Sequence, residues 1–212
     1  MKRLFLLVFI AAVSALSIQV ASASTVYTDY SAWLAATSGD HDPFGKPQDL
    51  GELSATSTVG VFGAPRGVFP ANTNVWNDRV TIAGKEVTTF FDGDGDANNP
   101  YYAFGGFWDL SPGGYGQGLM LSLDNGDVFN ICGDAVNGCG VGNYLVADGS
   151  FFGVVTSDFT TLSVTAGALS GSAETYDLSQ LDMVHTPEPS SFLLLGSGLA
   201  GLAGVIKRRL RA

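Results

Sequence analysis

The chain has 212 residues, of which 46% are hydrophobic, 11% aromatic and only 14% charged, with 28 glycines. This composition excludes intrinsic disorder, and it excludes collagen because the glycines follow no three-residue period. The net charge is −10, but residues 24–186 carry four basic against 19 acidic side chains, a net charge of −15. A body this acidic repels phosphate backbones, so no binding to nucleic acid is expected. The charge does not exclude binding of a cation or a sugar.

Residues 1–23 have the three parts of a secretory signal peptide. A positive start at residues 2–3 precedes an uninterrupted apolar run at 4–13 and a small-residue cleavage site, Ala-Ser-Ala, at 21–23. We therefore expect removal of this segment and a mature chain that begins near Ser24. The alternative is an uncleaved membrane anchor.

The segment after the signal predicts one short helix and then strands. A helix is expected over 31–37, capped by Ser31, because Tyr30, Trp33 and Leu34 share one face. Stretches rich in Val, Thr and aromatic residues, separated by turn residues, predict strands at 58–62, 79–82, 87–91, 103–109, 118–123, 128–131, 150–156, 160–165 and 175–184. Nine short strands without amphipathic helices between them predict an all-β fold, an antiparallel β-sandwich, which we expect to be a jelly roll.

Two of these strands show which side faces the core. Leucines alternate with other residues over 119–123, and Leu162, Val164 and Ala166 do the same in the strand at 160–165. Period-two alternation places such residues on one face of a strand, so we expect both sets to point inward. The Asp-Asn-Gly-Asp sequence at 124–127 predicts a tight hairpin turn.

Cys132 and Cys139 are the only cysteines. An exported chain meets an oxidising compartment, and an even cysteine count favours a disulfide between them. Free thiols or a metal site are the alternatives, although a zinc site has four clustered ligands and the histidines are distant.

The densest acidic cluster begins at Asp92, where Asp92, Asp94 and Asp96 alternate with glycines. Such a loop can direct several oxygens at one centre, as calcium requires. It is not an EF-hand, because Ala97 stands where that loop needs glycine and Ala103 where it needs glutamate. A calcium loop of another kind is one interpretation, and a solvated turn is the other.

Aromatic residues flank this acidic cluster and form a candidate glycan site. Sugar sites combine aromatic faces with polar groups, and the candidates here are Trp76, Tyr101, Tyr102 and Trp108. The alternative is that these rings belong to the hydrophobic core.

Catalysis finds little support in the sequence. His41 and His185 are the only histidines, and neither accompanies a nucleophile motif. Paired carboxylates could serve glycoside hydrolysis, but the acids are too many for a pair to be selected. We therefore expect no enzyme, with a polysaccharide hydrolase as the rival hypothesis.

The C-terminal segment, 187–212, has three consecutive parts. The first is a Pro-Glu-Pro tripeptide, Pro187, Glu188 and Pro189, and the second is an uncharged run at 192–206. The third is a basic cluster of Lys207, Arg208, Arg209 and Arg211. A helix over 192–206 is about 22 Å long, short for a bilayer core of about 30 Å, but flanking side chains can extend its reach. We expect a single transmembrane helix with the basic cluster in the cytoplasm and residues 24–186 outside.

This order of parts resembles the PEP-CTERM sorting signal of Gram-negative bacteria. The resemblance implies that an exosortase, a membrane-embedded cysteine peptidase, and the export machinery are partners, and that the membrane is an intermediate on the way to the cell envelope or extracellular matrix. Residues 151–162 and 174–181 resemble the closing strands of the outward domain in many such proteins, which is similar to carbohydrate-binding modules. The resemblance implies a structural or adhesive role with exopolysaccharide in a biofilm, or a matrix role without a specific ligand.

Overall fold

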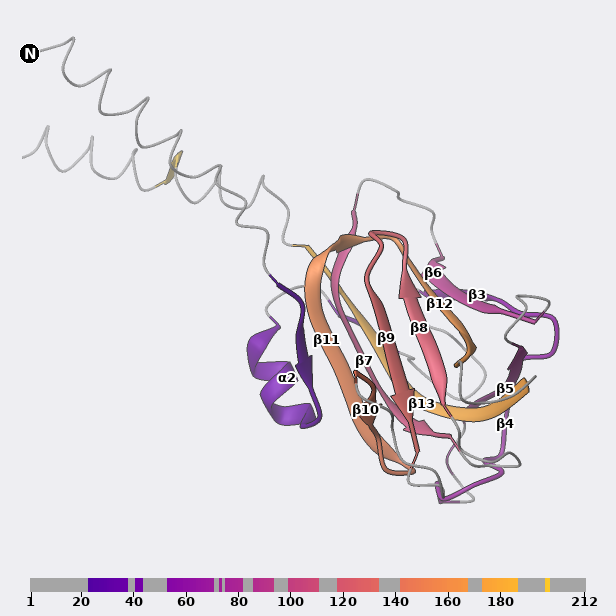
Figure 1. Cartoon of the computed structure of the whole chain (residues 1–212). Helices are drawn as coiled ribbons and strands as arrows, with labels where there is room; N and C mark the ends of the chain where they lie inside the picture. Colours follow the sequence, from indigo (N-terminus) through magenta and orange to yellow (C-terminus); the bar gives the residue numbers. More distant parts are fainter. Residues whose placement is uncertain are drawn as a thin grey trace, which may run out of the picture.

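The computed structural model describes residues 23–37, 41–43, 53–70, 73, 75–81, 86–93, 99–110, 118–133, 142–167, 173–186 and 197–198. These residues form two packed β-sheets with one short helix against them (Figure 1). The first sheet contains β1 (Thr25–Tyr27), β2 (His41–Pro43), β4 (Val61–Gly63), β5 (Val75–Thr81), β7 (Tyr101–Asp109), β11 (Ser150–Phe159) and β13 (Ala173–His185). The second contains β3 (Leu53–Thr56), β6 (Thr88–Asp92), β8 (Leu119–Leu123), β9 (Val128–Cys132), β10 (Tyr144–Leu145) and β12 (Thr161–Ala166). The all-β sandwich is therefore confirmed.

The strand pairing is nested. The order is β1-β11-β7-β13-β5-β4 in the first sheet, with β2 beside β13, and β10-β9-β8-β12-β6-β3 in the second. Strand β8 pairs with β9, β7 with β11, β6 with β12, and β5 with β13, all antiparallel, and successive pairs alternate between the sheets. One long antiparallel ribbon folded over itself has this pairing, which is that of a jelly roll.

The core lies between the sheets and follows the predicted alternation. Leu119, Leu121 and Leu123 are at most 5% exposed, and residues 162, 164 and 166 of β12 are at most 2% exposed. The turn after β8 is also as predicted: Gly126 has φ +97°, and the Asp127 N–H donates to the Asn125 side chain at 2.9 Å. Glycine is favoured at such a positive φ, which is why Asn-Gly predicts this hairpin.

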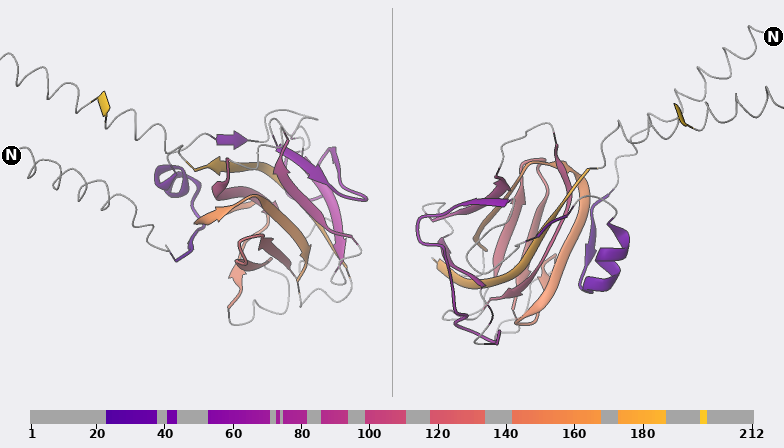
Figure 2. Two further views of the ribbon diagram at one scale, coloured as in Figure 1. Left: turned by 90° about the horizontal axis from the view of Figure 1, so that it is seen from above. Right: turned by 180° about the vertical axis from the view of Figure 1, so that it is seen from behind.

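Helix α2 (Tyr30–Ala36) covers the outer face of the first sheet (Figure 2). Its N-cap is Asp29, whose carboxylate accepts the Ala32 N–H at 2.7 Å, so the expected cap at Ser31 is wrong by two residues. Trp33 is fully buried in a second, smaller core with Ala103, Phe151 and Val184. The helix thus closes over a sheet face that would otherwise expose apolar side chains.

One predicted strand is wrong. Residues 58–62 do not form a single strand, because β3 ends at Thr56 and β4 begins at Val61 in the other sheet. Between them the Ser57 hydroxyl accepts the N–H groups of Val59 at 3.3 Å and Gly60 at 3.0 Å. A serine side chain that satisfies backbone donors in this way favours a turn over a strand.

Candidate functional site

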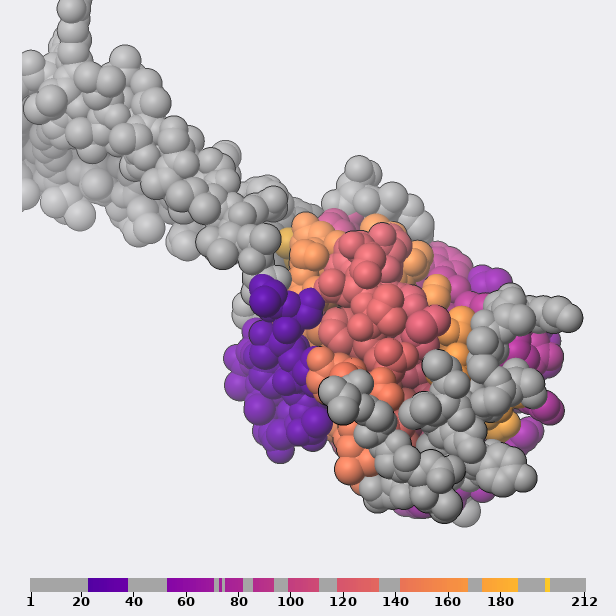
Figure 3. Space-filling view, in the orientation of Figure 1, coloured from indigo at the N-terminus to yellow at the C-terminus, as the bar shows by residue number. Residues whose placement is uncertain are grey.

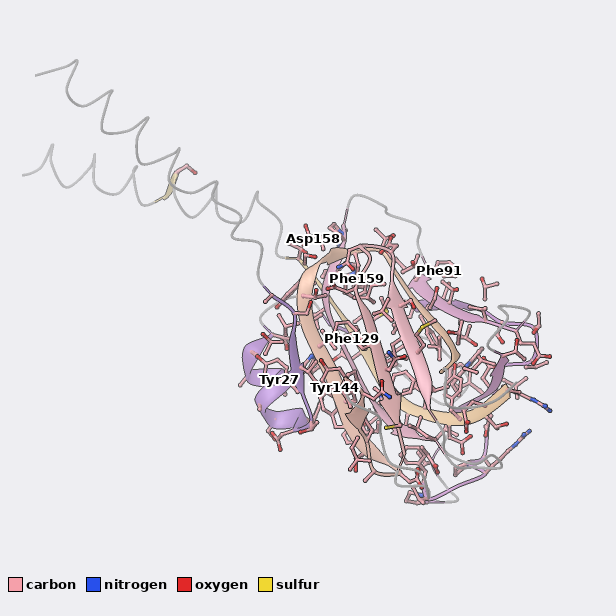
Figure 4. The ribbon with its side chains drawn as sticks, in the orientation of Figure 1. Tyr27, Phe91, Phe129, Tyr144, Asp158 and Phe159 are labelled. Carbon is pink, nitrogen blue, oxygen red and sulfur yellow. The ribbon has the colours of Figure 1, made fainter. Side chains whose placement is uncertain are left out.

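Both ends of the described body lie at one pole of the sandwich, beside the end of β11. Strand β1 starts with Thr25 opposite Val155, and β13 ends with His185 opposite Tyr101, which also pairs with Phe159. Figure 4 labels Asp158 and Phe159 at this pole. We call it the entry–exit pole, and we define it by Ser24, Asp127, Thr156, Asp158 and Thr186.

The chain enters this pole through a hydroxyl and carboxylate network. The Ser24 hydroxyl donates to Asp127 Oδ2 at 2.6 Å and lies 2.8 Å from the Thr156 hydroxyl. The Thr156 hydroxyl also donates to Asp127 Oδ2. Ser24, the expected first residue of the mature chain, is thereby attached to the turn between β8 and β9 and to strand β11, both distant in sequence.

The chain leaves the pole through a second network. The Thr186 N–H donates to the Pro100 carbonyl oxygen at 2.8 Å, and the Thr186 hydroxyl donates to Asp158 Oδ1 at 2.8 Å. The His185 ring stacks on Tyr101 with 4.2 Å between ring centroids, and its Nδ1 lies 2.8 Å from the Asn99 carbonyl oxygen. The backbone is thus held in place as far as Thr186.

The predicted targeting residues lie almost entirely outside the described residues. This applies to the signal peptide before Ala23, and to Pro187, Glu188, Pro189, Lys207, Arg208, Arg209 and Arg211. Of the predicted membrane helix at 192–206, only residues 197–198 are described. Within the described ranges, the structure contains no helix of sufficient length and apolarity to cross a membrane.

The aromatic residues proposed for sugar binding are mostly in the core. Trp76 is 6% exposed and Tyr101 and Trp108 are 0% exposed, whereas Tyr102 is half-buried against the smaller core. A fully buried ring offers no face to a sugar. The burial therefore favours the alternative given above, that these rings are core residues.

The acidic loop is described only at its start. Asp92 is the last residue of β6 and is half-buried, while Asp94 and Asp96 lie outside the described residues. Among the residues that the structure describes, no group of three His, Cys, Asp or Glu side chains converges as a metal site. Calcium binding by residues 92–96 stays a prediction.

Cys132 ends strand β9, is 4% exposed, and places its sulfur 3.7 Å from the Tyr144 carbonyl oxygen. Its predicted partner Cys139 falls within 134–141, outside the described ranges. The disulfide therefore stays a prediction.

The structure also brings together a carboxylate pair that the sequence did not identify. Asp109, Asp177 and Asn77 lie side by side on β7, β13 and β5, and they are 0%, 0% and 4% exposed. Backbone N–H groups of a covering loop donate to them, from Arg66 to Asp177 Oδ2 at 2.7 Å and from Val68 to Asp109 Oδ2 at 2.6 Å. Only the pairing of distant strands creates this cluster, so no local pattern could have revealed it.

The surroundings of Asp177 favour its neutral form. Burial raises the pKa of the Asp177 carboxyl, the Arg66 N–H lowers it, and the charge of Asp109 raises it again, with a net increase. Asp177 Oδ1 and Asn77 Oδ1 are both buried without a hydrogen-bond partner. A proton on Asp177 would remove its buried charge and turn one of its oxygens into a hydrogen-bond donor.

A second buried acid, Asp78, lies between the sheets. Its carboxylate accepts the Ser57 hydroxyl at 3.0 Å, the Trp76 indole N–H at 3.3 Å and the Thr88 hydroxyl. Burial raises the pKa of Asp78, and the hydrogen bonds oppose that shift. Burial and the nearby Asp78 charge also raise the pKa of Tyr176 well above its usual value. These groups connect β5, β6 and β13 and belong to the core.

The outer face of the second sheet is rich in hydroxyl groups. Thr89, Ser163 and Ser122 are register neighbours across β6, β12 and β8, and the hydroxyls of Thr89 and Ser163 are 3.1 Å apart. We call this surface the hydroxyl face, and its outward strand residues are Ser54, Thr56, Thr89, Phe91, Met120, Ser122, Val128, Asn130, Thr161 and Ser163. None of these ten described residues is charged, although the body as a whole is strongly acidic.

Comparison with known proteins identifies the C-terminal part of the chain. Residues 185–209 match the PEP-CTERM protein-sorting motif. No curated protein matches the chain. The motif indicates a surface protein that an exosortase processes during membrane-associated sorting, followed by export to the cell surface.

Proposed function

We propose, from the PEP-CTERM motif at 185–209, that this chain is an exported component of the cell envelope or extracellular matrix of a Gram-negative bacterium, and that its body contacts exopolysaccharide. The observation that supports the second part is the hydroxyl face. It is a broad sheet surface whose central strands are β8 and β12, with β8 near the middle of the view in Figure 3, and its described residues carry no charge.

The chemistry of this face suits a polymer of hydroxyl groups. Each Ser or Thr hydroxyl both donates and accepts a hydrogen bond, as does each sugar hydroxyl. The half-buried Phe91 and Met120 add apolar surface among them. Such contacts are individually weak, so we propose binding through many sugar units along a chain rather than in one deep pocket.

The rival hydrolase hypothesis gains no support from the buried pair. Asp109 and Asp177 are both 0% exposed beneath the loop that contains Arg66 and Val68. A glycosidase needs both carboxyl groups in contact with the scissile bond. This pair is therefore better explained by its contacts to the covering loop.

Binding of the detergent-solubilised full chain to a glycan array tests the proposal. The variant Ser163→Glu places a charge and a larger side chain at the centre of the hydroxyl face, and we expect it to abolish binding. Ser31→Glu makes the same chemical change on α2, on the opposite side of the sandwich, and should leave binding intact. Equal binding by wild type and Ser163→Glu would remove this face as the contact surface.

The same array with calcium and with a chelator separates the acidic loop from the hydroxyl face. Binding that is lost on chelation, and also in Asp92→Asn, would assign the contact to a calcium site at 92–96. Binding that survives chelation supports the hydroxyl face. Absence of binding under every condition would refute glycan contact and leave a matrix protein without a specific glycan ligand.

A further inference from the structure

The sorting motif and the folded body overlap. The motif match begins at residue 185, and His185 is the last residue of β13, the strand that pairs with both β5 and β7 in the first sheet. Thr186 continues the attachment through its N–H and its hydroxyl. One peptide bond therefore joins the last residue held by the body to Pro187.

Three kinds of contact hold these two motif residues to the body. The Thr186 backbone donates to Pro100 at 2.8 Å, and the Thr186 side chain donates to Asp158 at 2.8 Å. His185 is 7% exposed and stacks on Tyr101, with the two ring planes 24° apart. The main chain and both side chains of the motif's first residues are thus already engaged.

A protein that recognises a short linear segment commonly binds it in an extended form through main-chain hydrogen bonds. The main-chain donor of Thr186 is not available for this while Pro100 accepts it. The end of a strand can, however, open locally without unfolding of the whole domain, because few contacts are lost. Access to the start of the motif then depends on how firmly the body holds residues 185–186.

We propose that the body restrains its own sorting signal: His185 and Thr186 are positioning residues, and their release from Tyr101, Pro100 and Asp158 limits the rate at which the exosortase engages the signal. This inference rests on the sorting function that the motif indicates. The folded body would therefore slow the processing of its own sorting signal. The restraint can act only after the body has folded, since an unfolded body cannot form these contacts.

The variant Thr186→Val removes the hydroxyl that donates to Asp158 and preserves the shape of the side chain. In a pulse–chase experiment on the full chain in cells that contain the exosortase, we expect transfer from the membrane to the surface fraction to accelerate about fivefold, as loss of one hydrogen bond implies. Asp158→Asn keeps an acceptor for Thr186 and should transfer at close to the wild-type rate.

The matched control is Thr160→Val. The Thr160 hydroxyl donates to Asp124 at 2.5 Å in the turn after β11, so this variant also breaks a threonine–aspartate bond near the same pole. It does not touch the motif, and we expect its transfer rate to equal that of wild type. Equal acceleration in both threonine variants would show a general loss of stability and overturn the proposal.

A second variant inserts six Gly and Ser residues between Thr186 and Pro187. The insertion leaves the contacts of Thr186 in place but joins the body to the rest of the signal through a flexible linker, so the exosortase can reach residues from Pro187 onward. We expect it to accelerate transfer at least as much as Thr186→Val. No change in either variant, or slower transfer in both, would overturn the restraint while leaving the sorting function intact.

Hydrogen exchange provides a readout that does not depend on the exosortase. The amide of residue 186 should exchange several-fold faster in Thr186→Val than in wild type, and Thr160→Val should not change it. A wild-type chain that is never transferred would instead refute the sorting function, and the restraint with it.

Discussion

At the scale of single residues, two aspartates illustrate opposite effects of their surroundings. Asp177 is fully buried beside Asp109, whereas Asp124 is exposed and accepts hydrogen bonds from Thr160 and Thr161. For Asp124, burial alone would raise the pKa, but the hydroxyl and N–H of Thr160 lower it overall. The two groups should therefore affect stability with opposite dependence on pH.

We expect Asp177→Asn to stabilise the protein at pH 7, because the substitution removes a charge that burial and the neighbouring Asp109 disfavour. The folded state raises the pKa of Asp177 above 3.8, so it binds a proton that the unfolded chain has already lost, and stability falls as the pH rises through that interval. Asparagine removes the buried charge and can still accept the Arg66 N–H. Urea unfolding at pH 7 and pH 4 measures the gain, which should shrink at pH 4.

A loss of stability in Asp177→Asn at pH 7 would contradict this account, since it would mean that the ionised carboxylate has a favourable partner.

Asp124→Asn is the counterpart. We expect it to cost about 0.5 kcal/mol at pH 7, and this cost should disappear as the pH falls through the lowered pKa of the wild-type carboxylate, which then loses its charge.

At the scale of elements, the packing of α2 depends on glycines in the strands beneath it. Gly105 on β7 and Gly153 on β11 are register partners, and a Cβ atom on Gly105 would lie 2.6 Å from the Phe151 ring and 3.1 Å from Trp33. The helix can approach the sheet this closely only because both strands lack side chains there.

We expect Gly105→Ala to destabilise the protein by about 2 kcal/mol, because overpacking displaces the Trp33 and Phe151 rings. The control is Gly63→Ala on β4, where the added Cβ would lie 3.4 Å from the Asn77 side chain, an ordinary contact. Thermal unfolding of both variants measures the difference. Similar stability of the two would show that the helix does not depend on this glycine.

The loop between β9 and β10 provides an element-scale test of the predicted disulfide. If Cys132 and Cys139 are paired as predicted, the exported protein should take up no thiol-alkylating reagent before reduction and two equivalents after it. Reduction should cost about 2.5 kcal/mol, as closure of so short a loop implies. Intact mass spectrometry reads the adducts, and two adducts without a reductant would disprove the bond.

At the scale of the whole molecule, folding of the jelly-roll body and sorting by the C-terminal motif depend on different parts of the chain. Deletion of residues 187–212 should leave the body folded, because β13 ends at His185, but should release it from the envelope. Fractionation of cells, with circular dichroism of the released protein as the check on folding, measures both effects. A truncated body that stays bound to the envelope would show that another part of the chain anchors it.

Local sequence patterns were sufficient for much of the fold. The alternation at 119–123 predicted β8 and its buried face, Asn-Gly predicted the turn at Gly126, and the spacing of apolar residues predicted α2, although only Trp33 of the predicted face is buried. Each of these features depends on interactions within a few residues, which a sequence displays directly. The strand predicted at 58–62 was wrong because Ser57 turns the chain between two sheets, which β-propensity alone does not register.

The all-β class, the acidic character of the body and the sorting motif follow from the amino-acid sequence alone, since each is a property of composition or of residues that are close in the chain. The folded structure was needed to show that Tyr101 and Trp108 are core rings, that Asp109 lies beside Asp177, and that Thr186 is bound to Asp158. Those three facts depend on which strands become neighbours. Strand neighbours in a jelly roll are far apart in sequence, so long-range pairing and burial, rather than local preference, determine them.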